Sequence, residues 1–136
     1  MSNTHMGRRR VSLLAAMLMM GAVLVGPAIP GGAVDCYHGA PDVPTINSAF
    51  DVETYNTAWC TAVQAKTLKV QIRRLRTLWP DSVVAVAQDG GTKTSWQATP
   101  SGCEASASGS SHRYKGVSDF TGMATEHSSW TWLTCY

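Results

Sequence analysis

Aromatic side chains recur at alternate positions in two segments of this chain, which makes them its best candidates for contact with a ligand. Tyr55 and Trp59 are opposite in parity to Cys60, and Trp130 and Trp132 are opposite in parity to the last cysteine. Alternate residues of a β-strand face opposite sides. If the cysteines point into a core, these four side chains point outward, where they could stack on sugar rings or anchor a protein. The alternative is that the aromatic side chains fill the core and that the cysteines form disulfides between the ends of strands.

Residues for catalysis or metal binding are scattered. His38, His112 and His127 could each act as a base beside an acid such as Asp42, Asp119 or Glu126. Their spacing fixes no mutual geometry, and the chain has no G-x-S-x-G, H-E-x-x-H or glycine-rich phosphate motif. The histidines also lack the paired spacing of a zinc site. The sequence therefore predicts no enzyme, no metal site and no cofactor.

The first 33 residues have the layout of a secretory signal peptide. Three arginines at 8–10 precede an apolar run at 11–25, and proline, glycine and other small residues follow up to Ala33. We expect cleavage after Ala33 and a secreted, extracellular mature protein at residues 34–136; an uncleaved N-terminal anchor is the alternative. No later apolar run reaches the ~18 residues that a spanning helix needs, so no membrane contact is expected after cleavage.

Basic residues cluster within 11 positions of the mature segment: Lys66, Lys69, Arg73, Arg74 and Arg76. On one face they could meet an anionic cell-wall polymer, a nucleic acid or an acidic partner. The simpler interpretation is a solvated strand whose charges discourage pairing between sheet edges. Residues 34–136 carry 8 basic and 9 acidic side chains, a formal charge of −1 with histidine neutral. This balance favours the simpler interpretation and predicts no nucleic-acid partner.

Four cysteines, at positions 36, 60, 103 and 135, all follow the signal segment. In an oxidising compartment they would form two disulfides, for which three pairings are possible. We favour Cys36–Cys60 and Cys103–Cys135, because each pair is sequential and closes a modest loop. Each bond would stabilise the fold by ~3 kcal/mol, mainly by restricting the unfolded chain.

The mature segment is rich in Ser, Thr, Val and Gly, which favours strands and turns. Asp89-Gly90-Gly91 predicts a tight hairpin turn between strands at 82–88 and 92–99. Residues 65–79 fit both helical spacing and alternation; their β-branched side chains favour a strand, with a bulge at Arg73-Arg74. We predict one all-β domain, an antiparallel immunoglobulin-like sandwich of about six or seven strands with two disulfides.

Several short motifs occur in a fixed order in residues 34–136: Cys36-Tyr37-His38-Gly39, Cys60-Thr61-Ala62, Leu68 to Arg74, Cys103 before His112-Arg113-Tyr114, and Trp132-Leu133-Thr134-Cys135. This order resembles a loose group of short secreted actinobacterial proteins with four cysteines and an expected β-sandwich, most of which are uncharacterised. The resemblance covers nearly the whole mature segment. It implies the fold and secretion, and it carries over no active site.

The sequence therefore predicts a monomeric, secreted, non-catalytic domain that binds a cell-surface polysaccharide or a protein through Trp130, Trp132, Trp59 and Tyr55. A protease inhibitor is the first alternative, with Asp89–Lys93 or Ser101–Ser111 as the inhibitory loop. An antibacterial factor is another. A small hydrolase would require His112 or His127 within hydrogen-bond reach of Asp119 or Glu126.

Overall fold

The computed structural model describes residues 32–136, so the predicted signal segment, apart from its last two residues, lies outside the described residues. Residues 32–136 form a compact unit of their own that holds all the strands, both disulfides and both core clusters. This unit therefore contains the interactions that it needs to fold. None of the described segments is a helix that could cross a membrane.

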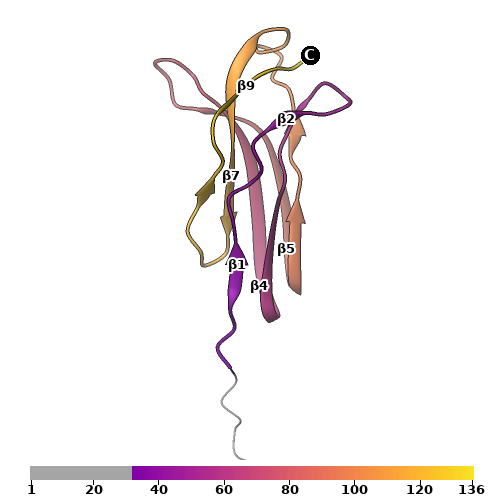
Figure 1. The fold of residues 1–136 in the computed structure, drawn as a ribbon, viewed down its shortest axis with the longest axis vertical. Coiled ribbons are helices and arrows are strands. Elements are labelled where there is room, and N and C mark those ends of the chain that lie inside the picture. Colours follow the sequence, from indigo (N-terminus) through magenta and orange to yellow (C-terminus); the bar gives the residue numbers. More distant parts are fainter. Residues whose placement is uncertain (1–31) are drawn as a thin grey trace, which may run out of the picture. The chain divides into compact units, whose positions relative to one another are not determined.

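Nine β-strands make up this unit, and every pairing between them is antiparallel (Figure 1). In chain order they are β1 (Cys36–His38), β2 (Thr45–Ile46), β3 (Val52–Glu53), β4 (Asn56–Arg74), β5 (Ser82–Ala98), β6 (Ser101–Gly102), β7 (Ser111–Phe120), β8 (Glu126–His127) and β9 (Thr131–Thr134). The prediction of an all-β antiparallel domain is confirmed. The immunoglobulin-like order of six or seven strands stays a prediction.

The strands belong to two sheets. In the six-stranded sheet, β4 pairs with β5 on one side, while β1 and β7 pair with successive parts of its other side; β8 and β9 pair with β7. The second sheet consists of the short strands β2, β3 and β6. Val52 of β3 is fully buried against Ile72 of β4 and Tyr114 of β7, so the two sheets share a core.

The ribbon formed by β4 and β5 bends near one end. Trp59 pairs with Ser95 and Gln64 pairs with Lys93, so four residues of β4 lie opposite one residue of β5. A bulge of this kind breaks the ladder locally and bends the strand. Beyond the bend the ribbon folds back over itself. This is shown by Ala58 and Leu68, which lie on either side of the bulge and point inward into the same core cluster.

Gly90 and Gly91 lie in the bent part of β5. The hairpin turn predicted at Asp89-Gly90-Gly91 is therefore wrong. All three residues lie inside β5 and pair with β4, and the residues after them continue the same strand. Gly91 has a φ of 126°, which a glycine adopts at little cost, so the residues that suggest a turn here permit a bend within a strand. The turn between β4 and β5 lies instead at residues 75–81.

The ambiguous segment at residues 65–79 is a strand as far as Arg74, as its β-branched residues indicate. The bulge predicted at Arg73-Arg74 lies on the partner strand instead: Ile72 pairs with Ala85 and Arg73 with Val83, which leaves Val84 of β5 as the extra residue. Both predicted disulfides are confirmed. Cys36–Cys60, with Cα atoms 4.0 Å apart, joins β1 to β4, and Cys103–Cys135 joins the segments after β6 and β9.

We expect Gly116→Ala to lower the free energy of unfolding by about 2 kcal/mol, because its Cβ would overpack a filled site. A Cβ on Gly116 would lie 2.8 Å from Cγ of Pro41 and 3.0 Å from Oγ1 of Thr54. Gly39→Ala is the matched control, since nothing lies within 4 Å of its Cβ position. Urea unfolding of residues 32–136 measures both. Equal stabilities for the two variants would contradict this packing.

Candidate functional site

Two exposed aromatic rings stack on each other across β1 and β4. Cys36 pairs with Cys60 and Tyr37 pairs with Trp59, so alternation turns the disulfide inward and the two rings outward. Their centroids are 4.1 Å apart with an interplanar angle of 21°, and each side chain is 48% exposed. The stack gives the surface an apolar ledge in which each ring covers one face of the other, so the outer faces and the edges of the rings remain for a ligand.

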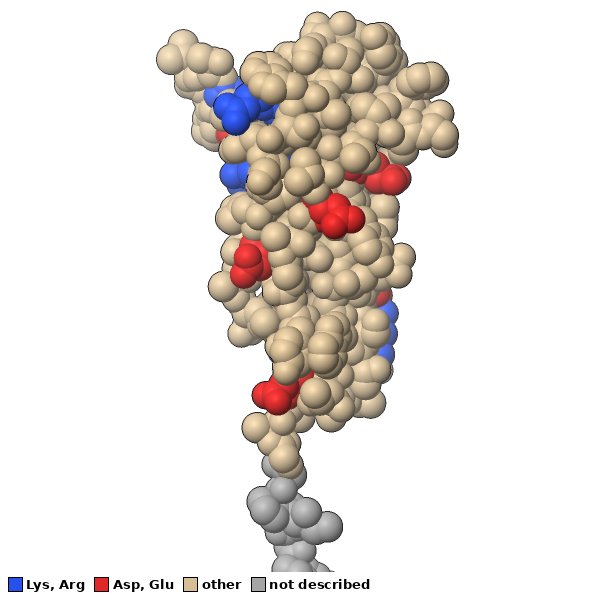
Figure 2. Space-filling model, viewed as in Figure 1, with Lys and Arg blue, Asp and Glu red and all other residues tan. Residues whose placement is uncertain are grey.

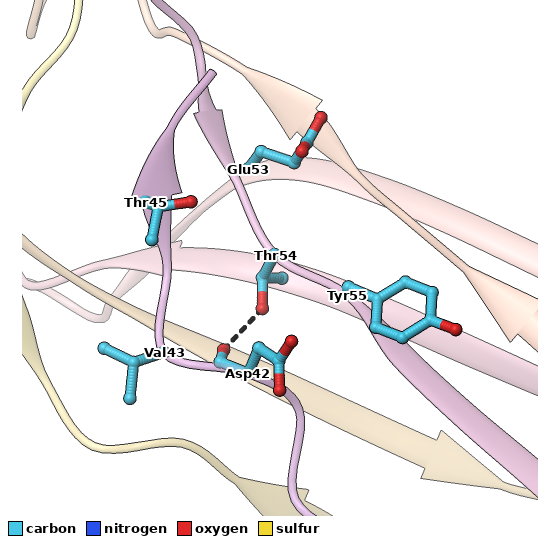
Figure 3. Close-up of a pocket in the computed structure, with 6 residues that line it drawn as sticks. All are labelled: Asp42, Val43, Thr45, Glu53, Thr54 and Tyr55. Atoms are coloured by element: carbon cyan, nitrogen blue, oxygen red, sulfur yellow. Dashed lines mark hydrogen bonds between the residues drawn. The ribbon is translucent and has the colours of Figure 1, made fainter.

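A hollow of about 310 Å³ adjoins this ledge. Tyr37 and Trp59 line it together with Tyr55 and Asp42. Asp42 and Tyr55 also line a neighbouring hollow of about 390 Å³ that reaches Glu53 (Figure 3). The two hollows share Asp42 and Tyr55, and together they are called here the Trp59 groove.

Backbone contacts hold Asp42 beside Tyr55. The amide of Asp42 donates to the carbonyl of Tyr55 (2.9 Å), and Oγ1 of Thr54 donates to the carbonyl of Asp42 (2.6 Å; Figure 3). These two bonds use the backbone of Asp42 and leave its exposed carboxylate free to accept hydrogen bonds from a ligand. Aromatic faces with nearby carboxylate acceptors suit a ligand that carries both C–H faces and hydroxyl groups.

A buried polar network supports the floor of the groove. Nε2 of His38 is hydrogen bonded to Oγ of Ser118, and Nδ2 of Asn56 donates to the same hydroxyl (2.6 Å) and to the carbonyl of Gly39 (2.9 Å). Ser118 is fully buried, so its hydroxyl is out of reach of a substrate in this arrangement. The network instead fixes the segment that leads from β1 to Asp42.

The other predicted pair, Trp130 and Trp132, lies elsewhere, on and beside β9. Trp130 is half-buried and Trp132 is exposed. The guanidinium of Arg113 lies 5.7 and 6.0 Å from their ring centroids, and Nζ of Lys115 lies 4.6 Å from the Trp130 ring. The outward parity predicted for the aromatic residues is therefore found, but the four side chains form two separate surfaces.

The remaining candidates do not assemble into one site. Among the described residues, neither His112 nor His127 is hydrogen bonded to Asp119 or Glu126; Asp119 accepts instead from Thr125 (2.5 Å). The basic cluster is spread along β4 and into the turn that follows it, and Arg74 turns inward to a 2.6 Å ion pair with Glu104. The proposed inhibitory loop at Asp89–Lys93 is part of β5, because its residues are paired with β4.

Sequence reasoning missed Tyr37 as a site residue and named Asp42 only as a possible acid beside a histidine. Tyr37 had a usable signal, because pairing Cys36 with Cys60 on adjacent antiparallel strands places residue 37 opposite residue 59. For Asp42 the sequence had no signal of a place in this groove, because its position depends on one hydrogen bond that its amide donates to Tyr55 and one that it accepts from Thr54.

No protein-family model matches this chain, and no curated protein was found that is similar to it. The fold and the site therefore define the molecule only as an all-β domain with two disulfides and an exposed aromatic groove.

We expect acid to destabilise the domain through His38. Burial lowers the pKa of His38 below its ordinary value of 6.5, although Glu126 and Asp119 act in the opposite direction. Below pH 6.5 the unfolded chain therefore binds more protons than the folded one, and stability falls as the pH falls. The free energy of unfolding, measured with urea from pH 7.5 to 5, should decrease, and His38→Gln should flatten this dependence.

His127→Gln is the control for this experiment, since His127 is exposed and lies outside the buried network. Its stability should keep the pH dependence of the parent. Asp89, with a lowered pKa, and Tyr114, with a raised one, titrate far outside this range. A pH dependence that survives unchanged in His38→Gln would contradict the assignment.

Proposed function

We propose that residues 34–136 are a secreted, non-catalytic carbohydrate-binding domain that holds a polysaccharide in the Trp59 groove. The observation that carries this proposal is the half-exposed Tyr37–Trp59 stack beside the carboxylate of Asp42. A pyranose ring has an apolar C–H face, which packs on an aromatic ring, and hydroxyl groups, which donate to carboxylates. The groove offers both kinds of contact within one surface.

The geometry supports a polysaccharide over a protein partner for this groove. Small-ligand sites combine aromatic walls with a few placed polar groups, as Tyr55 and Asp42 do here. The groove is open along two adjoining hollows, which suits a chain of sugar rings that enters and leaves at its ends. A rigid stack also costs little conformational entropy when a ligand binds.

Secretion and the finer architecture belong to the same proposal. The basic and apolar segments at residues 1–33 have the layout of a signal peptide, and both disulfides suit an oxidising compartment. An immunoglobulin-like sandwich would place the groove on the outer side of one layer. Peptide sequencing of the N-terminus of protein recovered from the medium tests the cleavage after Ala33.

The test of binding is a pull-down of oxidised residues 32–136 on insoluble cell-wall and plant polysaccharides. We expect binding to at least one of them, and about thirtyfold weaker binding for Trp59→Ala, because removal of a central aromatic anchor commonly costs about 2 kcal/mol. Tyr37→Ala should have a smaller effect in the same direction, since it leaves Trp59 in place.

Trp132→Ala is the matched control, because it removes an exposed tryptophan from the other aromatic surface. It should bind like the parent, and thermal unfolding should show that all three variants remain folded. Binding that is lost in Trp132→Ala but kept in Trp59→Ala would move the site away from the groove. No binding to any polysaccharide would refute the proposal.

A further inference from the structure

The turn at residues 75–81, between β4 and β5, carries the most exposed apolar side chain of the described residues. Leu78 is 95% exposed and Trp79 next to it is 70% exposed. Figure 1 shows the turn as the projecting loop at the upper left, beyond the end of the sheet. Neither side chain is used in the core, and neither belongs to the Trp59 groove.

The backbone of this turn makes the choice of leucine unfavourable within the domain. Leu78 has a φ of 70°, in the left-handed region that disfavours a side chain with a Cβ. A glycine would adopt the same conformation without strain. The chain thus combines a strained backbone with an apolar side chain in water. This combination makes Leu78 a candidate for contact with something outside the domain.

Positive charge surrounds the turn. Arg73, Arg76 and Arg113 have no ion pair among the described residues, whereas Arg74 is neutralised by Glu104 and Lys115 lies 3.9 Å from Asp81. Figure 2 shows blue side chains gathered beside the projecting turn, while most red ones on that face lie elsewhere. The three unpaired arginines therefore leave a local excess of positive charge behind an apolar tip.

Two hollows of about 250 Å³ each connect the tip to the second aromatic surface. One is lined by Leu75, Arg76, Trp79 and His112 among others, and the next by Leu75, Arg113 and Trp132 among others. The apolar tip, Trp132 of β9 and two of the arginines, Arg76 and Arg113, therefore belong to one continuous surface, called here the Leu78 tip.

We propose that the Leu78 tip docks the domain on the surface of a bilayer rich in anionic phospholipids. Leu78 and Trp79 would enter the interface, where an indole ring is at its most favourable and a leucine leaves water. The arginines behind them would face the headgroup phosphates, each adding an electrostatic attraction at short range.

Charge complementarity favours this occupant over a second copy of the chain. Two tips that met each other would bring four unpaired arginines, Arg76 and Arg113 of each copy, together in one interface, where like charges repel. The formal net charge of −1 gives no sign of such a surface. Screening limits the attraction to charges within a Debye length of about 8–10 Å of the membrane, so the membrane meets the local positive charge of the tip and not the charge of the whole domain. Docking at this tip leaves the Trp59 groove free, so the two proposals stand independently.

The test is co-sedimentation of oxidised residues 32–136 with vesicles of phosphatidylglycerol and, separately, of phosphatidylcholine. We expect binding to phosphatidylglycerol that weakens at high salt, and at least tenfold weaker binding to phosphatidylcholine. Leu78→Gly should reduce binding to phosphatidylglycerol about tenfold. Arg76→Gln should reduce it about fivefold, through the loss of one cation.

Leu78→Gly separates binding from folding, because it also relieves the backbone and should keep or raise the temperature of unfolding. Phe50→Gly is the matched control. Phe50 is also apolar, 59% exposed and at a positive φ of 64°, but Asp51 follows it and no arginine adjoins it in chain sequence. Phe50→Gly and Trp59→Ala should both bind vesicles like the parent.

Three results would overturn the proposal. The first is no sedimentation of the parent with phosphatidylglycerol vesicles, whether or not sedimentation velocity shows self-association. The second is equal binding to the two lipids. The third is a loss of binding in Phe50→Gly as large as that in Leu78→Gly, which would take the contact away from this tip.

Discussion

The pairing of β4 with β5 through a bend is the constraint on which the rest of the structure depends. Both strands are far longer than a usual strand of five or six residues, and a straight ribbon of this length would have no opposite layer to pack against. The bulge opposite residue 94 lets the ribbon return over itself. Its two halves then share one core cluster, which Phe120 of β7 completes by packing on Trp96 at a centroid distance of 5.0 Å.

The same bend decides what the surface displays. Along β4, even-numbered side chains such as Ala58 and Leu68 face inward on both sides of the bulge, so the odd-numbered ones, Trp59 among them, face out. The disulfide at Cys36–Cys60 locks β1 into the register that puts Tyr37 on Trp59. A slip of one residue would bury the rings and expose the cysteines. The groove is thus a consequence of strand register, fixed by a covalent bond.

Local chemistry in the sequence predicts the parts of this fold that depend on single strands. Alternation identified the outward aromatic residues, β-branched side chains identified β4, and loop length identified the disulfide pairs. The Asp89-Gly90-Gly91 segment failed because glycine permits both a turn and a bent strand, and only the distant residues 66–68 decide between them. The four predicted site residues form two surfaces and not one for a similar reason. Alternation predicts which face of a strand a side chain lies on, but not where that strand lies in the folded domain.

The distribution of tryptophan shows what the domain gives up in core stability. The chain has five tryptophans, and only Trp96 is fully buried. A domain of about 100 residues has little core to spare, and a buried tryptophan is among the largest contributions that it can make. The exposed rings also have different surroundings: Trp59 lies near the carboxylate of Asp42, whereas Trp130 and Trp132 lie against Arg113. Surfaces of opposite charge at separate places suit two different partners better than one extended ligand. The proposed sugar chain in the Trp59 groove and the proposed anionic bilayer at the Leu78 tip therefore do not compete for one site.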